Sequence, residues 1–403
     1  MEEKKGFFTK LKEVGPGAIV AAAIVGPGTI TAASQAGAGF GMTLIWALVF
    51  SVIATMFLQE MSTRLGIITG KDLGTAFREQ FSNPVLKFIA VTIVIAAIGV
   101  GNAAYETGNI LGGASGLAII TDTPIRLWAV LLGLFIGLLL WFGNYKVIEK
   151  FFVIMVGIIS LSFIITAVVI KPDIGAILSG IFVPKIPDGS IIFVISLIGT
   201  TIVPYTFFLQ SATVQERWKG KEAVSEGRFD IIFSMIVVAI ISVAIVVTAA
   251  GAFSLGTNIE DPSQMAIQLQ PLLGSWAKVV FAIGIFGAGA TSVMSASLAA
   301  AYAISGALGW KLDLKSYKFR AIWLIIILIG VIFSGLDYSP TEIIIFAQYA
   351  NGLILPIIVL FMIVVMSNSK RLGAYVNKTW MNVVAWIIFI ITLVLALQSF
   401  EVF

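Results

Sequence analysis

Two residue types are missing from this chain of 403 residues, which contains neither cysteine nor histidine. Without cysteine it has no disulfides, thiolate metal ligands or thiol redox chemistry, and without histidine it lacks the commonest general base and imidazole ligand. Charged residues make up only 11% of the chain, whereas about 25% is usual in a soluble protein. Because we also find no nucleophile paired with a base, we expect neither an enzyme nor a bound cofactor.

Long apolar runs dominate what is present, with 59% apolar residues and a mean hydropathy of +1.04. Runs of roughly 17 to 25 apolar residues match the hydrocarbon thickness of a bilayer, whereas outer-membrane barrels have shorter, alternating segments. We therefore predict an all-α polytopic membrane protein whose partner is the lipid bilayer, and no nucleic-acid partner despite the formal charge of +4. Eleven transmembrane helices are expected, centred near Pro27, Ile53, Gly101, Leu134, Ile159, Val203, Val243, Gly289, Leu328, Leu355 and Ile390.

The basic residues indicate how these helices are oriented. If the N-terminus is cytoplasmic, 21 of the 25 Lys and Arg residues fall on the cytoplasmic side. Only Arg126, Lys171, Lys185 and Lys278 fall on the other side. Because Lys and Arg are enriched in short cytoplasmic loops, we predict a cytoplasmic N-terminus in a bacterial cytoplasmic (inner) membrane. The segment up to Lys12 has no cleavage site, so we expect no signal peptide.

Two of the predicted spans are interrupted near their centres. The segment Gly26-Pro27-Gly28-Thr29 lies inside the first span, and Pro204 lies inside the sixth, within Gly199 to Thr206. Proline lacks the backbone donor and clashes with the preceding turn, so we expect both helices to be broken. A broken helix persists in lipid only where it is buried in protein or lines a cavity. The two breaks are therefore predicted to form a solute site at the bilayer midplane.

The second break comes five helices after the first. Because five is an odd number, the second set of five helices crosses the membrane in the opposite direction, which is typical of an inverted-repeat transporter. We predict one transmembrane domain, residues 1–403, with a first repeat at 15–170 and an inverted second repeat at 189–367. An extra helix at 379–401 lies outside the repeats. Two unrelated proline kinks are the alternative explanation.

Short motifs are spread over the whole chain. They are Gly15-Pro-Gly-Ala, Gly26-Pro-Gly-Thr and Gln35-Ala-Gly-Ala-Gly-Phe-Gly41 in the first helix, Leu58-Gln59 and Ser62-Thr-Arg-Leu-Gly-Ile-Ile-Thr-Gly-Lys-Asp-Leu73 after it, Gly199 to Pro204 with Gln210-Ser-Ala-Thr-Val-Gln215, and Pro340-Thr-Glu342 with Gln348 and Leu355-Pro356. In order and spacing they resemble the motifs of the Nramp family of divalent-metal transporters. The resemblance implies a LeuT-type 5+5 inverted repeat with helices 1 and 6 broken, and secondary transport by alternating access.

The chain departs from the family's pattern at the residues that would bind metal. The first break reads Asp-Pro-Gly-Asn in the family, and here Gly26 and Thr29 stand in place of the Asp and the Asn. The second reads Met-Pro-His, and here Val203 and Tyr205 stand in place of the Met and the His. Gln348, which resembles a tenth-helix residue that joins the site, is retained.

The predicted substrate site therefore carries no charge. Its candidate residues are Gly26, Pro27, Gly28, Thr29, Thr200, Val203, Pro204, Tyr205, Thr206 and Gln348. We identify no carboxylate, Cys or His in the first coordination shell of a metal. Transition metals favour nitrogen, sulfur or carboxylate ligands, so a metal substrate is expected to be a hydrated hard cation such as Mg²⁺ rather than Mn²⁺ or Fe²⁺.

One acidic residue, Glu106, falls in the central part of a span, within the polar stretch Asn102 to Asn109. The paired acids that the resemblance implies for proton passage are replaced by Gly108 and Leu111. A carboxylate inside the bilayer costs about 2.5 to 3.5 kcal/mol, which suggests a function. We predict that Glu106 neutralises a cationic substrate or carries a coupling proton. The alternative is a protonated acid that is hydrogen-bonded to a neighbouring helix.

Three functions are consistent with these features. The resemblance implies an Nramp-like secondary transporter of a divalent metal cation, which is the function we predict. A neutral site with two half-helix N-termini pointing inward also suits a small organic solute, including an anionic one. A non-transporting sensor or scaffold would have a collapsed break without a path for solute. The sequence identifies no coupling ion.

Overall fold

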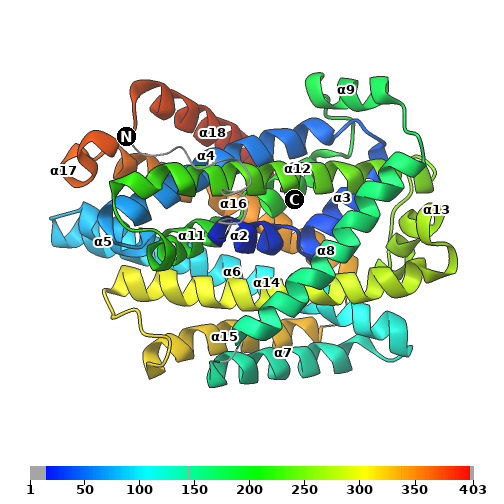
Figure 1. Cartoon of the computed structure of the whole chain (residues 1–403), viewed down its shortest axis with the longest axis horizontal. Coiled ribbons are helices and arrows are strands. Elements are labelled where there is room, and N and C mark those ends of the chain that lie inside the picture. Colours follow the sequence, from blue (N-terminus) through cyan, green and yellow to red (C-terminus); the bar gives the residue numbers. More distant parts are fainter. Residues whose placement is uncertain (1–14, 144, 337, 400–403) are drawn as a thin grey trace.

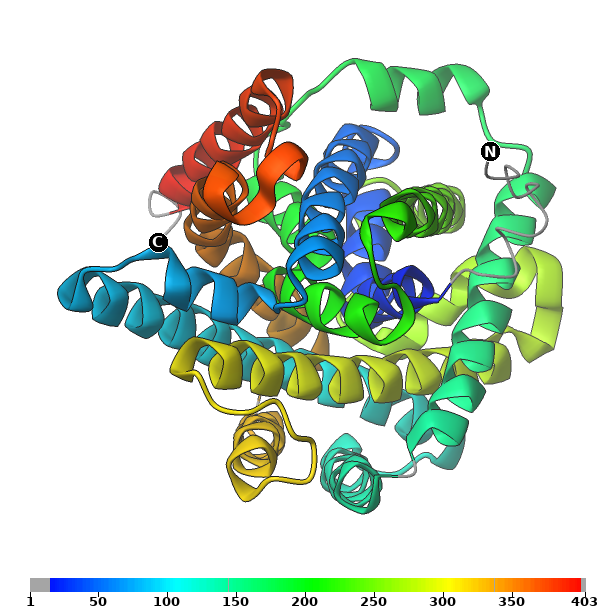
Figure 2. The same ribbon diagram turned by 60° about the vertical axis from the view of Figure 1, so that its left-hand side comes forward.

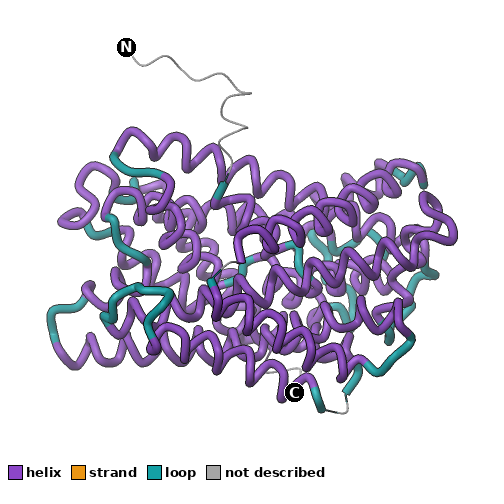
Figure 3. Tube along the Cα trace, turned by 60° about the horizontal axis from the view of Figure 1, so that its bottom comes forward, coloured by secondary structure: helices purple, strands orange, loops and turns teal. Residues whose placement is uncertain are grey.

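The computed structural model describes residues 15–143, 145–336 and 338–399, and these residues form helices and connecting loops without any strand (Figures 1 and 3). The basic N-terminal segment up to Lys12 and the end of the predicted extra helix lie outside these ranges. The longer helices and half-helices are α2 (Pro16–Ile24), α3 (Pro27–Phe40), α4 (Ile45–Thr69), α6 (Pro84–Thr121), α7 (Ile125–Phe142), α8 (Tyr145–Val169), α10 (Ile191–Thr201), α11 (Pro204–Arg217), α12 (Val224–Ala252), α14 (Ala277–Leu308), α15 (Tyr317–Ser334), α16 (Pro340–Met366) and α18 (Thr379–Ser399).

Most of these helices are long and apolar enough to cross a membrane. Among the described residues there are ten such spans, or eleven when α2 and α3 count as one span bent by 49°. The segment from α10 to α11 is also a single span. The structure thus confirms the prediction of eleven helices with the first and the sixth broken. Proline at the first position of α3, α11 and α16 fits the rule that proline is tolerated where a helix begins.

Short helices connect the spans. They are α5 (Leu73–Gln80), α9 (Ile174–Phe182), α13 (Gln270–Leu273) and α17 (Ser369–Leu372), with the 3₁₀ turns η1 (Lys221–Ala223), η2 (Pro262–Leu269), η3 (Gly274–Trp276) and η4 (Gly373–Tyr375). Helix α9 follows α8 and precedes α10, where the two predicted repeats would meet. The repeat boundaries themselves remain a prediction.

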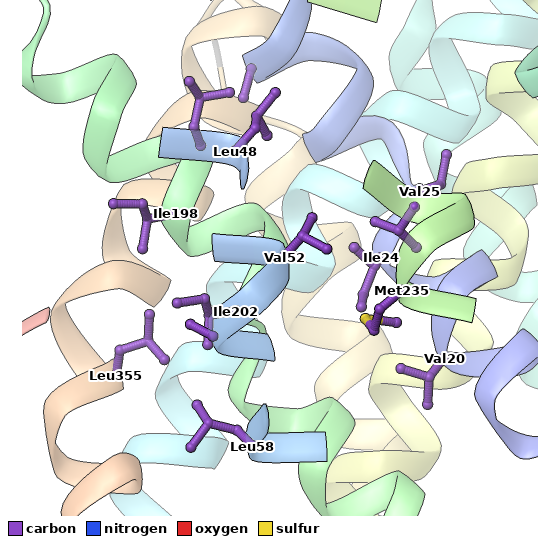
Figure 4. Packing of buried hydrophobic residues seen from close by; sticks show 14 of the residues in the cluster. Val20, Ile24, Val25, Leu48, Val52, Leu58, Ile198, Ile202, Met235 and Leu355 are labelled. Carbon is purple, nitrogen blue, oxygen red and sulfur yellow. The ribbon is translucent and has the colours of Figure 1, made fainter. Parts of the chain in front are cut away.

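The broken first helix lies in the interior of the bundle. In Figure 2 the blue helices α2 and α3 are surrounded by other helices, and the residues of α3 from Pro27 to Ala38 are all buried. Apolar side chains on both breaks, such as Ile24 and Ile202, belong to one buried cluster that also includes Val52 of α4 (Figure 4). Packing of apolar side chains therefore holds both breaks in place on the sides that carry no polar groups.

Glycines on α6 let this helix approach the first break closely. A side chain at Gly112 would collide with the ring of Pro27, and one at Gly113 would lie 3.2 Å from the Cα atom of Gly289 in α14. Small residues at such positions are typical of closely packed membrane helices. Helix α6 consequently places Tyr105 and Glu106, about two turns before these glycines, near the centre of the molecule.

Candidate functional site

The first break consists of two residues between two half-helices. Helix α2 ends at Ile24, Val25 leaves the helical conformation at φ −78° and ψ 53°, and Gly26 is extended at φ −91° and ψ −174°. Pro27 then begins α3. No side chain caps the N-terminus of α3, so its first backbone N–H groups are available to a bound solute.

The second break repeats this arrangement. Helix α10 ends at Thr201, Ile202 has φ −87° and ψ 77°, Val203 is extended at φ −92° and ψ 113°, and Pro204 begins α11. The N-terminus of α11 also lacks a side-chain cap. The two breaks therefore share one design, in which an extended residue precedes a proline that starts the second half-helix.

Threonine hydroxyls join the two breaks to each other. The Oγ1 of Thr29 donates a hydrogen bond of 2.5 Å to the Ile24 carbonyl and lies 2.9 Å from the Oγ1 of Thr200. Because the Thr29 proton is used for Ile24, the hydroxyl of Thr200 is the donor in the second contact. Thr206 donates to the Val203 carbonyl at 2.7 Å. The structure thus brings these predicted site residues together across the breaks.

Gln348 of α16 also faces the breaks, as predicted. Its side chain lies against Gly28, where an added Cβ would come 2.9 Å from the amide oxygen and even closer to the amide nitrogen. Its backbone carbonyl is in close contact with Gly199. The side chain is fully buried, and neither amide atom has a hydrogen-bond partner among the described residues. Gln348 therefore offers both a donor and an acceptor to a solute at the first break.

Two tyrosines form a wall beside the second break. The rings of Tyr105 and Tyr205 meet edge to face with their centroids 5.4 Å apart, and both are fully buried. Within the described part of the chain neither hydroxyl has a hydrogen-bond partner. They pack in a small cluster with Val203, Leu209 and Ala296. Tyr205, the residue in place of the family's histidine, thus contributes an aromatic surface and an unpaired hydroxyl.

Glu106 is fully buried, and its side chain is turned toward α14 and α15. Its Oε1 accepts a hydrogen bond of 2.7 Å from Ser297 of α14, and a side chain at Gly330 of α15 would come 2.8 Å from its Cγ. Its Oε2 has no partner among the residues that the structure describes. The neighbouring Tyr105 packs against Tyr205, and Glu106 also interacts electrostatically with Tyr205, so the carboxylate lies near the second break.

Helix α4 contributes site residues that the sequence analysis did not identify. The hydroxyl of Thr55 shares its proton between the Ser51 carbonyl at 2.7 Å and the Thr201 carbonyl at 3.0 Å. Gln59 donates a hydrogen bond of 2.7 Å to Thr206. Thr55 and Gln59 are both fully buried and support the second break. Polar residues at Thr55, Gln59 and Thr63, four apart in an apolar span, are the pattern that would have predicted this face.

Hydrogen bonds hold both ends of the broken first helix in place. The Asp230 carboxylate of α12 accepts hydrogen bonds from the backbone N–H groups of Gly15 at 2.9 Å and Gly17 at 2.6 Å, which fixes the start of α2. At the far end of α3, Gln35 exchanges two hydrogen bonds with the backbone of Ile259. All ten candidate substrate residues are buried.

The donors of the site are neutral oxygens and amides. Within the described ranges no three side chains of the His, Cys, Asp and Glu types come together to hold a metal ion. The hydroxyls of Thr29, Thr200 and Thr206 and the amide of Gln348 are all uncharged. A cation in the breaks would therefore keep part of its hydration shell, as hard divalent cations do when a site supplies few ligands.

Comparisons with known proteins agree with this architecture. The family model described as natural resistance-associated macrophage protein-like, Nramp, matches residues 17–400. The divalent metal cation transporter MntH of Klebsiella pneumoniae is 28% identical over 386 residues, covering 94% of this chain and 91% of the relative. MntH of a Nostoc species is 29% identical over 402 residues, covering 94% and 88%.

Solved structures show the same fold. A manganese transporter of Eremococcus coleocola superposes with a TM-score of 0.81 at 21% identity, covering 99% of this chain and 88% of that one. Mhp1, a nucleobase-cation-symport-1 family transporter, superposes with a TM-score of 0.59 at 14% identity, covering 96% and 91%. These similarities confirm the predicted LeuT-type fold.

Proposed function

Because the chain belongs to the Nramp family, we propose that it transports a divalent metal cation across the membrane by alternating access around the two breaks. The observation that carries the proposal is the pairing of the breaks, in which the buried hydroxyl oxygens of Thr29 and Thr200 lie 2.9 Å apart. Half-helices that meet at the centre of a span are where secondary transporters bind their solutes. The relatives named MntH support a divalent cation as the solute.

We further propose that the cation is a hard one, with Mg²⁺ favoured over Mn²⁺. Three hydroxyls and one amide supply oxygen ligands, and Val203 and Tyr205 provide neither sulfur nor imidazole. Mn²⁺ and Fe²⁺ gain more than Mg²⁺ does from nitrogen and sulfur ligands. A neutral oxygen site removes that advantage, so selectivity should shift toward the ion that is bound through its own water molecules.

Glu106 is proposed to supply the negative charge that the breaks lack. It is the acidic residue predicted at the centre of a span, and one of its oxygens has no partner among the described residues. The carboxylate either offsets the charge of the cation or carries a proton that is exchanged for it. Both roles require the carboxylate, so replacing Glu106 by Gln should abolish coupled uptake.

A second candidate function is transport of a small organic solute that carries a carboxylate. The N-termini of α3 and α11 have no side-chain cap, and Gly26 and Val203 place no negative charge beside them. Helix N-termini of this kind attract anions. The uncapped N-termini favour this function, whereas the family and the free amide oxygen of Gln348 favour a cation.

Uptake by purified protein in liposomes tests both functions. We expect uptake of Mg²⁺ that is lost in Thr200→Val, because that change removes the hydroxyl that bridges the breaks. Thr392→Val is the matched control, since Thr392 is also buried but its hydroxyl bonds only to its own helix, α18, at Ile388 and Phe389. Uptake of a small carboxylate in place of either Mg²⁺ or Mn²⁺ would instead support the second function.

A further inference from the structure

Four polar residues, Gln59 and Thr63 of α4 and Thr206 and Gln210 of α11, form a line of contacts next to the second break, which we call the polar seam. Gln59 donates a hydrogen bond of 2.7 Å to Thr206, and Gln210 donates one of 2.9 Å to Thr63. Gln59 and Thr63 are four residues apart on α4, and Thr206 and Gln210 are four residues apart on α11. The two hydrogen bonds, which we call rungs, therefore lie about one helical turn apart. Both rungs are fully buried.

Three oxygen atoms in or next to the polar seam have no hydrogen-bond partner among the described residues: Oε1 of Gln59, Oε1 of Gln210 and Oγ of Ser62. The orientation of the Gln59 amide follows from its partner, because the Thr206 hydroxyl already donates to the Val203 carbonyl and must accept from Gln59. The amide nitrogen of Gln59 therefore faces Thr206, and its oxygen remains free. Ser62 lies on the same side of α4, three residues after Gln59.

A buried oxygen atom without a hydrogen-bond donor or a cation beside it lowers the stability of the protein. A buried acceptor without a partner costs about 1 to 3 kcal/mol, and lipid supplies no hydrogen-bond donor to replace water. Two amide oxygens and a hydroxyl are the uncharged ligands that a hard cation accepts when it keeps several of its water molecules. Gln59, Ser62 and Gln210 are all neutral, and the nearby guanidinium of Arg64 is paired with Glu60, so no unpaired positive charge on these side chains attracts an anion. The seam therefore suits a hydrated cation.

The seam also lies between the substrate site and the cytoplasmic surface. Thr206 belongs to the second break, and Gln210 lies one turn further along α11 toward Arg217, on the side that the basic residues assign to the cytoplasm. Asp230 holds the start of α2 on this same side. A cation released from the breaks toward the cytoplasm would thus meet the seam after the site and before the start of α2.

We propose that Gln59, Ser62 and Gln210 form an inner subsite that holds the hydrated divalent cation on its way from the breaks to the cytoplasm. This inference rests on the proposed function. The subsite replaces part of the hydration shell through neutral oxygens, binds the ion weakly and so lets it leave. The hydrogen-bonded rungs keep the amide oxygens in place while α2 moves.

The absence of cysteine from the chain allows a direct test. Ser62→Cys would be the only thiol, and its reaction with a membrane-impermeant cationic thiol reagent can be followed in inside-out vesicles. We expect Ser62→Cys to react at least tenfold faster than Leu360→Cys, and millimolar Mg²⁺ to slow the reaction. Leu360 is the control because it is exposed on the outside of the bundle and lies about as far from the end of α16 as Ser62 lies from the end of α4.

Equal reaction rates for the two thiols, or a fast reaction that Mg²⁺ does not slow, would overturn the inner subsite. Uptake of Mg²⁺ by the wild-type protein distinguishes this failure from failure of the proposed function. If wild-type uptake is present and the Ser62→Cys thiol is unprotected, only the subsite is wrong. If wild-type protein takes up no divalent cation, the proposed function is wrong and the subsite with it.

A second variant separates binding from passage. Gln210→Leu removes the amide oxygen, and we expect it to leave equilibrium binding of Mg²⁺ within threefold while it lowers the rate of uptake at least tenfold. Gln215→Leu is the matched control, because Gln215 is also on α11 but bonds to the carbonyl of Ser211 in its own helix. An unchanged uptake rate in Gln210→Leu would contradict the proposal.

Discussion

A negative charge can be restored to the first break by Gly26→Asp. The backbone at Gly26, with φ −91° and ψ −174°, is accessible to any residue. The added Cβ would come 2.5 Å from the Oγ of Ser292, which is too close, but 3.5 Å from its Cβ, which is ordinary contact. The substitution should therefore be combined with Ser292→Ala, which removes the obstructing hydroxyl and keeps the Cβ.

The expected gain follows from the charges. A carboxylate about 4 Å from a doubly charged ion gains about 8 kcal/mol at an effective dielectric constant near 20. Removing the carboxylate from water costs several kcal/mol, and the waters that the ion gives up cost more. A net gain of about 1.4 to 2.8 kcal/mol remains, which corresponds to tenfold to hundredfold tighter binding.

Titration calorimetry with Mn²⁺ measures this change, with Ser292→Ala alone as the control. We expect the combined variant to bind Mn²⁺ tenfold to hundredfold more tightly than the control does. Mn²⁺ is the informative ion, because a carboxylate adds the charged ligand that the break of this chain lacks. Equal affinities in the two proteins would refute the idea that the missing charge at Gly26 sets the selectivity of the site.

Three further predictions concern residues around the site. Asp230→Asn should weaken the attachment of the start of α2 to α12 by about 1.5 kcal/mol, because a hydrogen bond to a charged group is lost. The rate at which Ser62→Cys is labelled from the cytoplasmic side should then rise about tenfold. Gly28→Ala should lower uptake at least tenfold, because the added Cβ would displace the Gln348 amide. Gly157→Ala is the control and should not lower uptake, because a Cβ added there has no neighbouring atom within 4 Å. Equal uptake by the two variants would contradict this prediction. Burial raises the pKa of Asp72, so its contribution to stability is present at acidic pH and lost as the pH rises through the folded-state pKa. Thermal unfolding of Asp72→Asn should therefore depend less on pH, and an unchanged pH dependence would count against this.

The positions of the breaks could be predicted because proline acts locally. Pro27 and Pro204 lack a backbone donor wherever they stand, and apolar sequence on both sides makes each break a membrane feature. The number of helices followed from the lengths of the apolar runs, and the basic residues gave their orientation. Family motifs added Gln348, whose side chain the structure places at Gly28.

The contacts that support the site could not be predicted in this way. Asp230 meets the start of α2 across 213 positions of sequence, and no local pattern indicates which carboxylate does so. The surroundings of Glu106 depend likewise on how α14 and α15 pack against α6, which brings Ser297 to it. The polar seam could be predicted in part. The sequence shows the four-residue spacing of Gln59 and Thr63 on α4, but it does not show that their partners lie on α11.

Calorimetric titration of the purified protein with Mg²⁺ and Mn²⁺ tests the central claim most directly. We predict that Mg²⁺ binds and that Glu106→Gln abolishes its binding, while Glu222→Gln, a change at an exposed acid, leaves it intact. Loss of binding only in Glu106→Gln would identify this carboxylate as the charge that replaces the family's missing Asp. If neither ion binds to the wild-type protein at millimolar concentration, a divalent cation is not the substrate, and the account is contradicted.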